Sequence, residues 1–205
     1  MAISLIEGTF SALIFDCDGT LVDSAPAHLR SIQQALKPLG LTMTADWYHL
    51  RHGLGPDPLI DEYEAAFNPP PIDRAAFFAR NNIAYQAAIP LIEEITFVAD
   101  IARVWHGRVP MAVASNGVLE NVEATLVNVG LRSLFDYIVT ADDVKHGKPA
   151  PDVYLEAARR MKVDPAACTV FEDSDEGLEA AHRAGARAID IRKEAPLATS
   201  SAKNP

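Results

Sequence analysis

The chain has 205 residues, of which 49% are hydrophobic and 22% charged, a balance typical of a folded protein and not of a disordered or fibrous one. With 18 Lys and Arg against 28 Asp and Glu, the formal net charge is −10, which disfavours nonspecific binding to nucleic acid. No apolar run approaches the roughly 20 residues of a membrane span, and the N-terminus lacks the basic segment of a signal peptide, so we expect no membrane partner and a cytoplasmic location. The two cysteines are too few for a disulfide framework or a cysteine metal site.

Short apolar runs recur along the chain and end in small or acidic residues. Continuous apolar strands, buried on both faces, are typical of a parallel sheet, so we interpret these runs as the strands of one sheet. The expected strands are residues 11–16, 109–115, 135–140, 167–172 and 186–191.

Helical periodicity occupies the segments between the later strands. Apolar residues recur on one face over residues 118–129, 151–161 and 178–184, with Gly after the first and third segments and Pro at the start of the second. A further helix is expected over residues 91–105. This alternation of strands and helices predicts an α/β core with a Rossmann-like, doubly wound parallel sheet.

The connection between the first two strands is too long for one crossover helix. It contains three helical patterns, over residues 28–36, 59–67 and 74–88, separated by Gly and Pro. A connection of that length is usually a subdomain or lid. We therefore interpret residues 20–90 as a small all-helical cap, inserted into a core formed by residues 1–19 and 91–205.

Polar side chains that could catalyse a reaction or bind a ligand follow the ends of the expected strands. Asp16 and Asp18 stand two residues apart and share one face of the first strand end, and Gly19 allows a sharp turn beside them. Ligands of open parallel sheets bind beyond the carboxyl ends of the strands. The residues that this rule gathers at one edge are Asp16, Asp18, Ser115, Asn116, Lys148, Glu172 and Asp173.

Four carboxylates in one crevice repel each other unless a cation neutralises them. Oxygen-only ligands favour Mg²⁺, which typically binds a few carboxylates together with water and substrate phosphate. A lysine and a hydroxyl group complete a clamp for phosphate. The pattern therefore predicts metal-assisted phosphoryl transfer.

The ordered motifs DxDGT…DS, SN, GKPAPD and EDSDEG resemble those of the haloacid dehalogenase-like hydrolase superfamily over nearly the whole chain. The helical insertion looks like the family's type-1 cap. The stretches WHGRVPMAVAS and TADDVKHGKPAPD are similar to the small sugar-phosphate phosphatases of the beta-phosphoglucomutase-like branch.

The resemblance implies a role for each matched position. Asp16 would be the nucleophile, forming an aspartyl-phosphate, and Asp18 the general acid and base. Lys148 would offset negative charge on the nucleophile and the phosphoryl group.

The other matched positions would bind phosphate or metal. Ser115 and Asn116 would bind phosphate, and Thr20 would steady the loop beside Asp18. The implied Mg²⁺ ligands are Asp16, the backbone carbonyl of Asp18, Asp173 and Glu172, with Glu172 either a direct ligand or a partner of one. Candidate substrate residues of the cap are His28, Arg51 and His52.

These residues predict a monomeric Mg²⁺-dependent phosphatase acting on a small phosphorylated metabolite, expected to be a sugar phosphate. A phosphomutase of the beta-phosphoglucomutase type remains open: residues 51–56 resemble its cap substrate loop, but Pro56 stands where an arginine is expected, and Arg51 could compensate. A dehalogenase is disfavoured by Asp18, and a phosphonatase by the lack of a suitable cap lysine. A protein that binds a phosphorylated metabolite without turnover is a further alternative.

Overall fold

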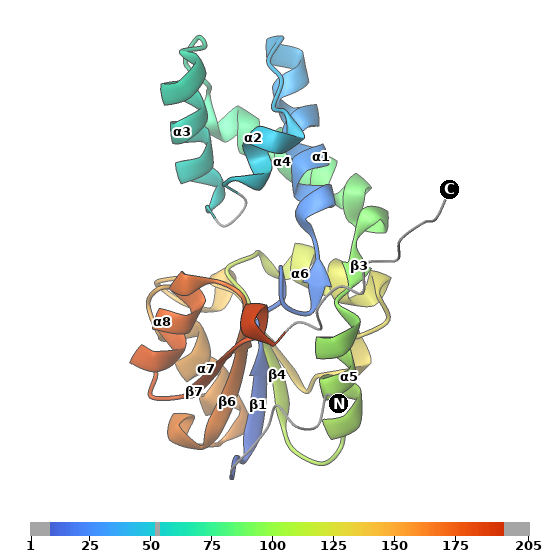
Figure 1. Cartoon of the computed structure of the whole chain (residues 1–205), viewed down its shortest axis with the longest axis vertical. Helices are drawn as coiled ribbons and strands as arrows, with labels where there is room; N and C mark the ends of the chain where they lie inside the picture. Colours follow the sequence, from blue (N-terminus) through green and yellow to red (C-terminus); the bar gives the residue numbers. More distant parts are fainter. Residues whose placement is uncertain (1–8, 52–53, 195–205) are drawn as a thin grey trace, which may run out of the picture.

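A five-stranded parallel sheet forms the centre of the larger part of the molecule (Figure 1). The computed structural model describes residues 9–51 and 54–194. The strand order is β5-β4-β1-β6-β7, and every neighbouring pair is parallel. Each strand lies within one of the ranges expected from the sequence, so the predicted fold class is confirmed. The strands are β1 (Ala12–Phe15), β4 (Met111–Ala114), β5 (Tyr137–Val139), β6 (Cys168–Glu172) and β7 (Arg187–Asp190).

Helices cover both faces of this sheet, which explains why its strands are continuously apolar. Alternate residues of β1 point to opposite faces: Leu13 and Phe15 belong to one buried cluster, and Ala12 and Ile14 to another. The first cluster packs against α5 (Thr96–Trp105) and α6 (Leu119–Asn128), and the second against α7 (Asp152–Met161) and α8 (Asp175–Arg183).

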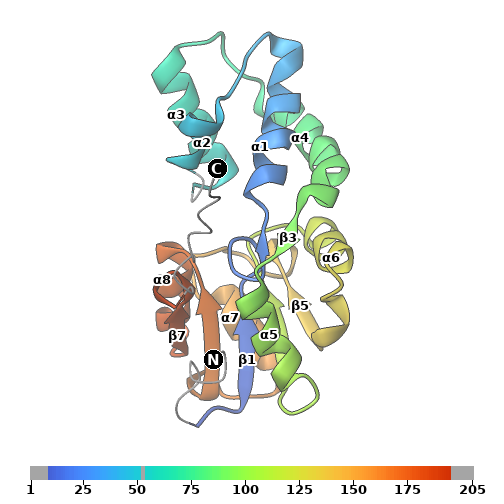
Figure 2. The ribbon, with the colours of Figure 1, turned by 45° about the vertical axis from the view of Figure 1, so that its right-hand side comes forward.

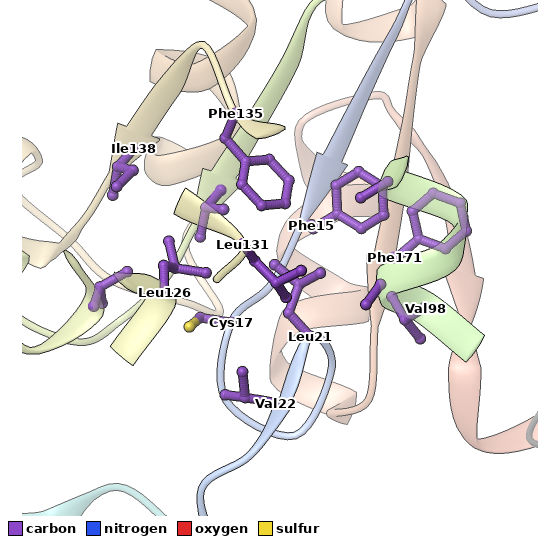
Figure 3. Close-up of a cluster of buried hydrophobic side chains, with 14 of the residues drawn as sticks. Phe15, Cys17, Leu21, Val22, Val98, Leu126, Leu131, Phe135, Ile138 and Phe171 are labelled. Carbon is purple, nitrogen blue, oxygen red and sulfur yellow. The ribbon is translucent and has the colours of Figure 1, made fainter. Parts of the chain in front are cut away.

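Figure 3 shows the first of these clusters at the end of β1. The Phe15 and Phe171 rings stack with their centroids 4.7 Å apart. Cys17, which lies between the two acids of the first motif, points into this cluster and is fully buried (Figure 3). Cys17 therefore serves packing, although its neighbours Asp16 and Asp18 face the polar edge of the sheet.

Four helices lie beyond the carboxyl ends of the strands and are called here the helical region (Figure 1). They are α1 (Ala25–Leu36), α2 (Ala45–His49), α3 (Pro56–Phe67) and α4 (Arg74–Ala88). They enclose their own apolar cluster, with Leu36, Tyr63 and Phe77 among its buried members. All four fall inside the predicted cap, whose limits remain a prediction.

The chain passes between the sheet and the helical region through two short antiparallel strands, β2 (Val22–Asp23) and β3 (Glu93–Glu94) (Figure 2). The prediction of a helix from residue 91 is wrong in its first part, because Glu94 pairs with Val22 and the Ile95 N–H donates to the Leu21 carbonyl at 2.8 Å. The extended pairing delays the start of α5 to Thr96. Short 3₁₀ turns complete the fold: η2 (Lys37–Leu39), η3 (Ile89–Leu91), η4 (Arg132–Leu134), η5 (Ala141–Asp143), η6 (Pro165–Ala167) and η7 (Ile191–Lys193).

Among residues 9–51 and 54–194, no helix combines the length and the apolar character needed to cross a membrane.

Candidate active site

Lys148 and Asp16 form a buried ion pair at the carboxyl edge of the sheet. Asp16 follows β1 directly, and Lys148 lies in the loop before α7. The Lys148 Nζ donates to Asp16 Oδ1 at 2.5 Å, to Glu172 Oε1 at 2.7 Å and to the Ala114 carbonyl at 3.0 Å. An ammonium group has three N–H donors, so this arrangement uses all of them and fixes the direction of the lysine.

Glu172, the last residue of β6, is fully buried, and both of its carboxylate oxygens accept several hydrogen bonds. Its Oε1 accepts from Lys148 and from the Tyr154 hydroxyl, both at 2.7 Å. Its Oε2 accepts from the Asp173 N–H at 2.9 Å and from the Ser174 N–H and hydroxyl at 3.0 Å. Five donors on one carboxylate hold Glu172 rigidly against the lysine.

Burial and neighbouring charges shift the pKa values of Asp16, Lys148 and Glu172 in opposite directions. Burial raises the pKa of Asp16 well above its ordinary value, and the Lys148 ammonium opposes that rise. Burial would also raise the pKa of Glu172, but Lys148 and the hydrogen bond from Tyr154 outweigh it and lower that pKa. Burial would lower the pKa of Lys148, but the carboxylate of Asp16 and its neighbours raise it, so the ammonium stays charged.

Asp173 lies close to this pair because Gly19 leaves room for its carboxylate. Gly19 has a φ of +87°, and a Cβ at that position would overlap the Asp173 side chain. The Thr20 hydroxyl donates to Asp173 Oδ1 at 2.9 Å. Burial raises the pKa of Asp173 to about 6, against the effect of the Thr20 hydrogen bond.

Asp18 turns toward the helical region. The Asp18 Oδ1 atom lies 3.5 Å from Nε2 of His28 on α1. This oxygen is buried and accepts no hydrogen bond from a described residue. Burial favours a higher pKa for Asp18, but interactions with His28 and Ser24 lower it.

Ser115 and Asn116 follow β4 at the same edge. The Ser115 hydroxyl accepts from the Gly117 N–H at 3.0 Å. The Asn116 side chain accepts from the Lys148 N–H at 2.8 Å and donates to the Lys148 carbonyl at 3.3 Å. Asn116 therefore fixes the backbone of the lysine that faces Asp16.

Of the two described residues predicted to contact substrate from the cap, His28 approaches Asp18 and Arg51 does not. Arg51 is engaged within the helical region: its Nε donates to Glu62 Oε2 at 2.6 Å, and its guanidinium lies 4.1 Å from the centre of the Trp47 ring. Its NH1 also donates to the Trp47 carbonyl at 3.2 Å. His52 lies outside the described residues.

The donor set at the sheet edge fits a divalent cation. Asp16, Glu172 and Asp173 each offer a carboxylate oxygen, and these oxygens lie within 4.8 Å of one another. Since Glu172 is occupied by five donors, Asp16 and Asp173 are the two that can turn an oxygen toward a metal. Oxygen ligands of this kind suit Mg²⁺.

Tyr154 on α7 was missed by the sequence reasoning, which placed it on the apolar face of that helix. It is almost fully buried, as that interpretation requires, but its hydroxyl bonds Glu172. A buried tyrosine needs a partner for its hydroxyl, and this requirement, applied to a helix that follows the lysine loop, is the signal that could have identified it.

Comparison with known proteins places this geometry in a family. The family model described as "haloacid dehalogenase-like hydrolase" matches residues 10–185. The chain is 38% identical to the fructose-1-phosphate phosphatase YqaB of Escherichia coli (strain K12) over 183 residues, covering 89% of this chain and 97% of that protein.

Solved structures agree with the sequence comparison. A mutant of CbbY from Rhodobacter sphaeroides in complex with xylulose-(1,5)bisphosphate superposes with a TM-score of 0.76 at 29% identity, covering 88% of this chain and 85% of that one. A putative beta-phosphoglucomutase from Thermotoga maritima gives 0.71 at 27% identity, with coverage of 88% and 84%.

These matches confirm the predicted family and, through relatives named as phosphatases, the predicted enzyme class, a phosphoric monoester hydrolase. With its family model spanning most of the chain and its buried lysine–carboxylate group at the edge of a parallel sheet, the protein belongs to the haloacid dehalogenase-like hydrolases.

Proposed function

We propose that the protein hydrolyses the phosphate monoester of a small sugar-like metabolite, with Mg²⁺ as cofactor and Asp16 as nucleophile. The observation that carries this proposal is the contact of 2.5 Å between Asp16 Oδ1 and Lys148 Nζ, beside Asp173 at the carboxyl edge of the sheet. The Lys148 ammonium opposes the rise that burial causes in the Asp16 pKa and so favours the carboxylate, which is the form that attacks phosphorus.

The reaction proceeds in two displacements. The Asp16 carboxylate attacks the phosphorus atom while the bond to the leaving oxygen breaks, and Asp18 gives a proton to that oxygen. Asp18 then takes a proton from water, which attacks the aspartyl-phosphate and releases inorganic phosphate with Asp16 restored. Lys148 stabilises the negative charge on the transferred group in both steps.

A Mg²⁺ ion bound by Asp16, Asp173 and the Asp18 carbonyl would neutralise these acids and the phosphoryl oxygens. Glu172 supports the site by orienting Lys148 and does not bind the metal directly, because its oxygens already accept five hydrogen bonds. Ser115 and Asn116 contribute to the phosphate side, Asn116 through the Lys148 backbone.

We propose that the helical region serves as the cap. Hydrolysis is favoured over phosphoryl transfer to a second sugar position, because Arg51, which could replace the arginine absent at Pro56, is paired with Glu62. His28 would act at the leaving-group side, and the predicted role of His52 is retained as part of this proposal. The monomeric state and the cytoplasmic location remain predictions.

The test is turnover of an aryl phosphate. We expect hydrolysis with Mg²⁺, loss of activity on adding a chelator, and recovery when Mg²⁺ is restored. Asp16→Asn should lower kcat by several orders of magnitude while the circular dichroism spectrum of the folded protein is retained. Full turnover without divalent metal, or retained activity of the variant, would refute the proposal.

A second assay separates the phosphatase from the mutase and from a non-catalytic binding protein. Incubation with a hexose 1-phosphate should release inorganic phosphate. An isomeric sugar phosphate would indicate a mutase, and binding without any product would indicate a binding protein.

A further inference from the structure

One face of α6 carries polar side chains that contact the last segment of the helical region. Asn121, Thr125 and Asn128 follow one another at intervals of four and three residues, so they share one side of the helix. Each makes a hydrogen bond to residues 82–92, which include the end of α4 and η3. In Figure 2, α6 lies below the end of α4. These bonds therefore join the helical region to a helix that covers the sheet.

Amide side chains form the two ends of this α4–α6 contact. Asn121 Oδ1 accepts from the Gln86 amide, and Asn121 Nδ2 donates to Asn82 Oδ1 at 3.0 Å. At the other end of α6, Asn128 Nδ2 donates to the Ile89 carbonyl at 3.1 Å. Hydrogen bonds depend on direction as well as distance, so this set fixes how α4 is turned against α6.

Tyr85 lies between the two ends of the contact and is almost fully buried. Its hydroxyl is 3.4 Å from the Thr125 hydroxyl. Although Tyr85 belongs to α4, its ring is part of the buried cluster of the sheet, together with Val122 and Leu126 of α6. Phe77, about two turns earlier on α4, belongs to the apolar cluster of the helical region instead. Helix α4 is therefore anchored in both parts of the molecule.

The Tyr85 ring also reaches the surroundings of the proposed general acid. It packs against the His28 ring of α1 with the two centroids 4.7 Å apart. His28 Nε2 in turn lies 3.5 Å from Asp18 Oδ1, a buried oxygen that accepts no hydrogen bond from a described residue. An N–H···O hydrogen bond spans up to roughly 3.2 Å, so a small displacement of the imidazole decides whether it bonds Asp18.

We infer that Tyr85 is a positioning residue that holds His28 against Asp18. Helix α6 fixes Tyr85 in turn, through Thr125 and through the amide contacts on either side. This inference rests on the proposed phosphatase function, in which Asp18 protonates the leaving oxygen. Helix α6 begins just after the loop that follows β4 and contains the proposed phosphate-binding residues. One helix therefore sets both the phosphate side of the site and the histidine beside the acid, and placement of this kind contributes to the rate.

The experiment compares two esters whose leaving oxygens differ in their need for a proton. Nitrophenol leaves readily as its anion, whereas benzyl alcohol is a much weaker acid and needs protonation as it leaves. The full-length enzyme is assayed with Mg²⁺ on para-nitrophenyl phosphate and on benzyl phosphate. The measured quantity is kcat/KM, which reports transfer to Asp16, because hydrolysis of the aspartyl-phosphate is the same for both esters.

Tyr85→Leu removes the ring that supports His28. We expect kcat/KM for benzyl phosphate to fall by at least about tenfold, and that for para-nitrophenyl phosphate by less than about threefold. Tyr85→Phe keeps the ring and should restore most of the wild-type ratio. The matched control is Tyr63→Leu, because Tyr63 is buried in the apolar cluster of the helical region. This control should lower both esters by the same factor, and equal losses in Tyr85→Leu would overturn the inference.

Two further variants extend the test. Thr125→Val keeps the shape of the side chain and should change the ratio of the two esters in the same direction, by about two- to threefold. If Tyr85→Leu does not fold, an unchanged ratio in Thr125→Val would overturn the inference. In a His28→Ala background, Tyr85→Leu should add little to the loss, because both act on the same contact. Additive losses would show that Tyr85 does not act through His28.

The wild-type enzyme separates this inference from the proposed function. No turnover of either ester would overturn the proposed function, and the inference with it. Turnover of para-nitrophenyl phosphate without benzyl phosphate would remove Asp18 as the acid, and the inference would fall while Asp16 remained the proposed nucleophile. Turnover of both esters, with the expected change of ratio in Tyr85→Leu, would support both.

Discussion

The sheet edge and the helical region use charge in opposite ways. At the sheet edge, Lys148 is buried against Asp16 and Glu172, and its ammonium has a partner for every proton. In the helical region, pairs such as Arg51 with Glu62 lie nearer the surface, with 28% and 50% of their side chains exposed.

This difference reflects what each part must do. Phosphoryl transfer needs charges fixed in a site of low dielectric, where they act strongly and need no rearrangement. The helical region, which we propose as the cap, instead pairs Arg51 and Arg74 with carboxylates of α3 in partly exposed contacts that hold its helices together.

Removal of the Lys148 charge should produce the largest effect. Lys148→Met leaves Asp16 and Glu172 buried without their cation, which we expect to lower the free energy of unfolding by about 3–5 kcal/mol and to reduce kcat by orders of magnitude. Denaturant unfolding and aryl phosphate kinetics measure the two effects. Lys145→Met, an exposed change in the same loop, is the control and should behave like the wild type. Equal free energies of unfolding for the two variants would show that the buried contacts of Lys148 with Asp16 and Glu172 do not stabilise the site.

The fit of Gly19 around Asp173 should give the next largest effect. Gly19→Ala adds a methyl group that overlaps the Asp173 carboxylate, and it also forces alanine into a positive φ. Gly130→Ala, at a φ of +72° with open space around it, carries only the backbone cost of about 1–2 kcal/mol. Thermal unfolding should therefore shift in both variants, whereas kcat and Mg²⁺ affinity should fall only in Gly19→Ala. Equal activity of the two variants would contradict the proposed metal position.

The strands and the acids were predictable from sequence because they depend on short-range signals. A strand buried on both faces is a continuous apolar run, and the carboxyl end of each such run marks where Asp16, Ser115 and Glu172 meet. The start of α5 was not predictable, because the extended conformation of Glu94 depends on pairing with Val22, more than 70 residues earlier. Helix α2 is five residues long, too short for a helical period to be visible.

The hydrogen-bond partners of long polar side chains also could not be predicted from the sequence. Arg51 was a candidate for substrate binding, but its position is set by Glu62 and Trp47, which α2 and α3 bring together only in the folded chain. For Tyr154 the prediction missed a polar contact, because the apolar residues that recur along α7 indicated packing alone. In both cases the residue type was informative, whereas the partner depended on tertiary structure.

Tyr154→Phe should have a moderate effect on the sheet edge. The change removes one hydrogen bond to the Glu172 carboxylate while leaving the ring in the apolar cluster, so we expect a loss of about 1.5–3 kcal/mol in unfolding free energy. If Glu172 positions Lys148, kcat should fall several-fold with KM unchanged. The control is Tyr137→Phe, at a side chain 37% exposed on β5. A rise in KM with constant kcat would indicate that Tyr154 affects binding instead.

Arg51→Met should have the smallest effect. The pair with Glu62 is partly exposed, so its loss, together with the contact on Trp47, should lower the free energy of unfolding by about 1 kcal/mol. Because Arg51 is engaged by Glu62 and Trp47 within the helical region, we expect kcat/KM for a sugar monophosphate to stay within about twofold of wild type. Glu62→Gln sharpens the test, since it releases the guanidinium: if Arg51 were a phosphate ligand, this variant would gain affinity for a bisphosphate. A large rise in KM for Arg51→Met, or such a gain, would place a cation at the leaving-group side and remove the contrast between the two regions.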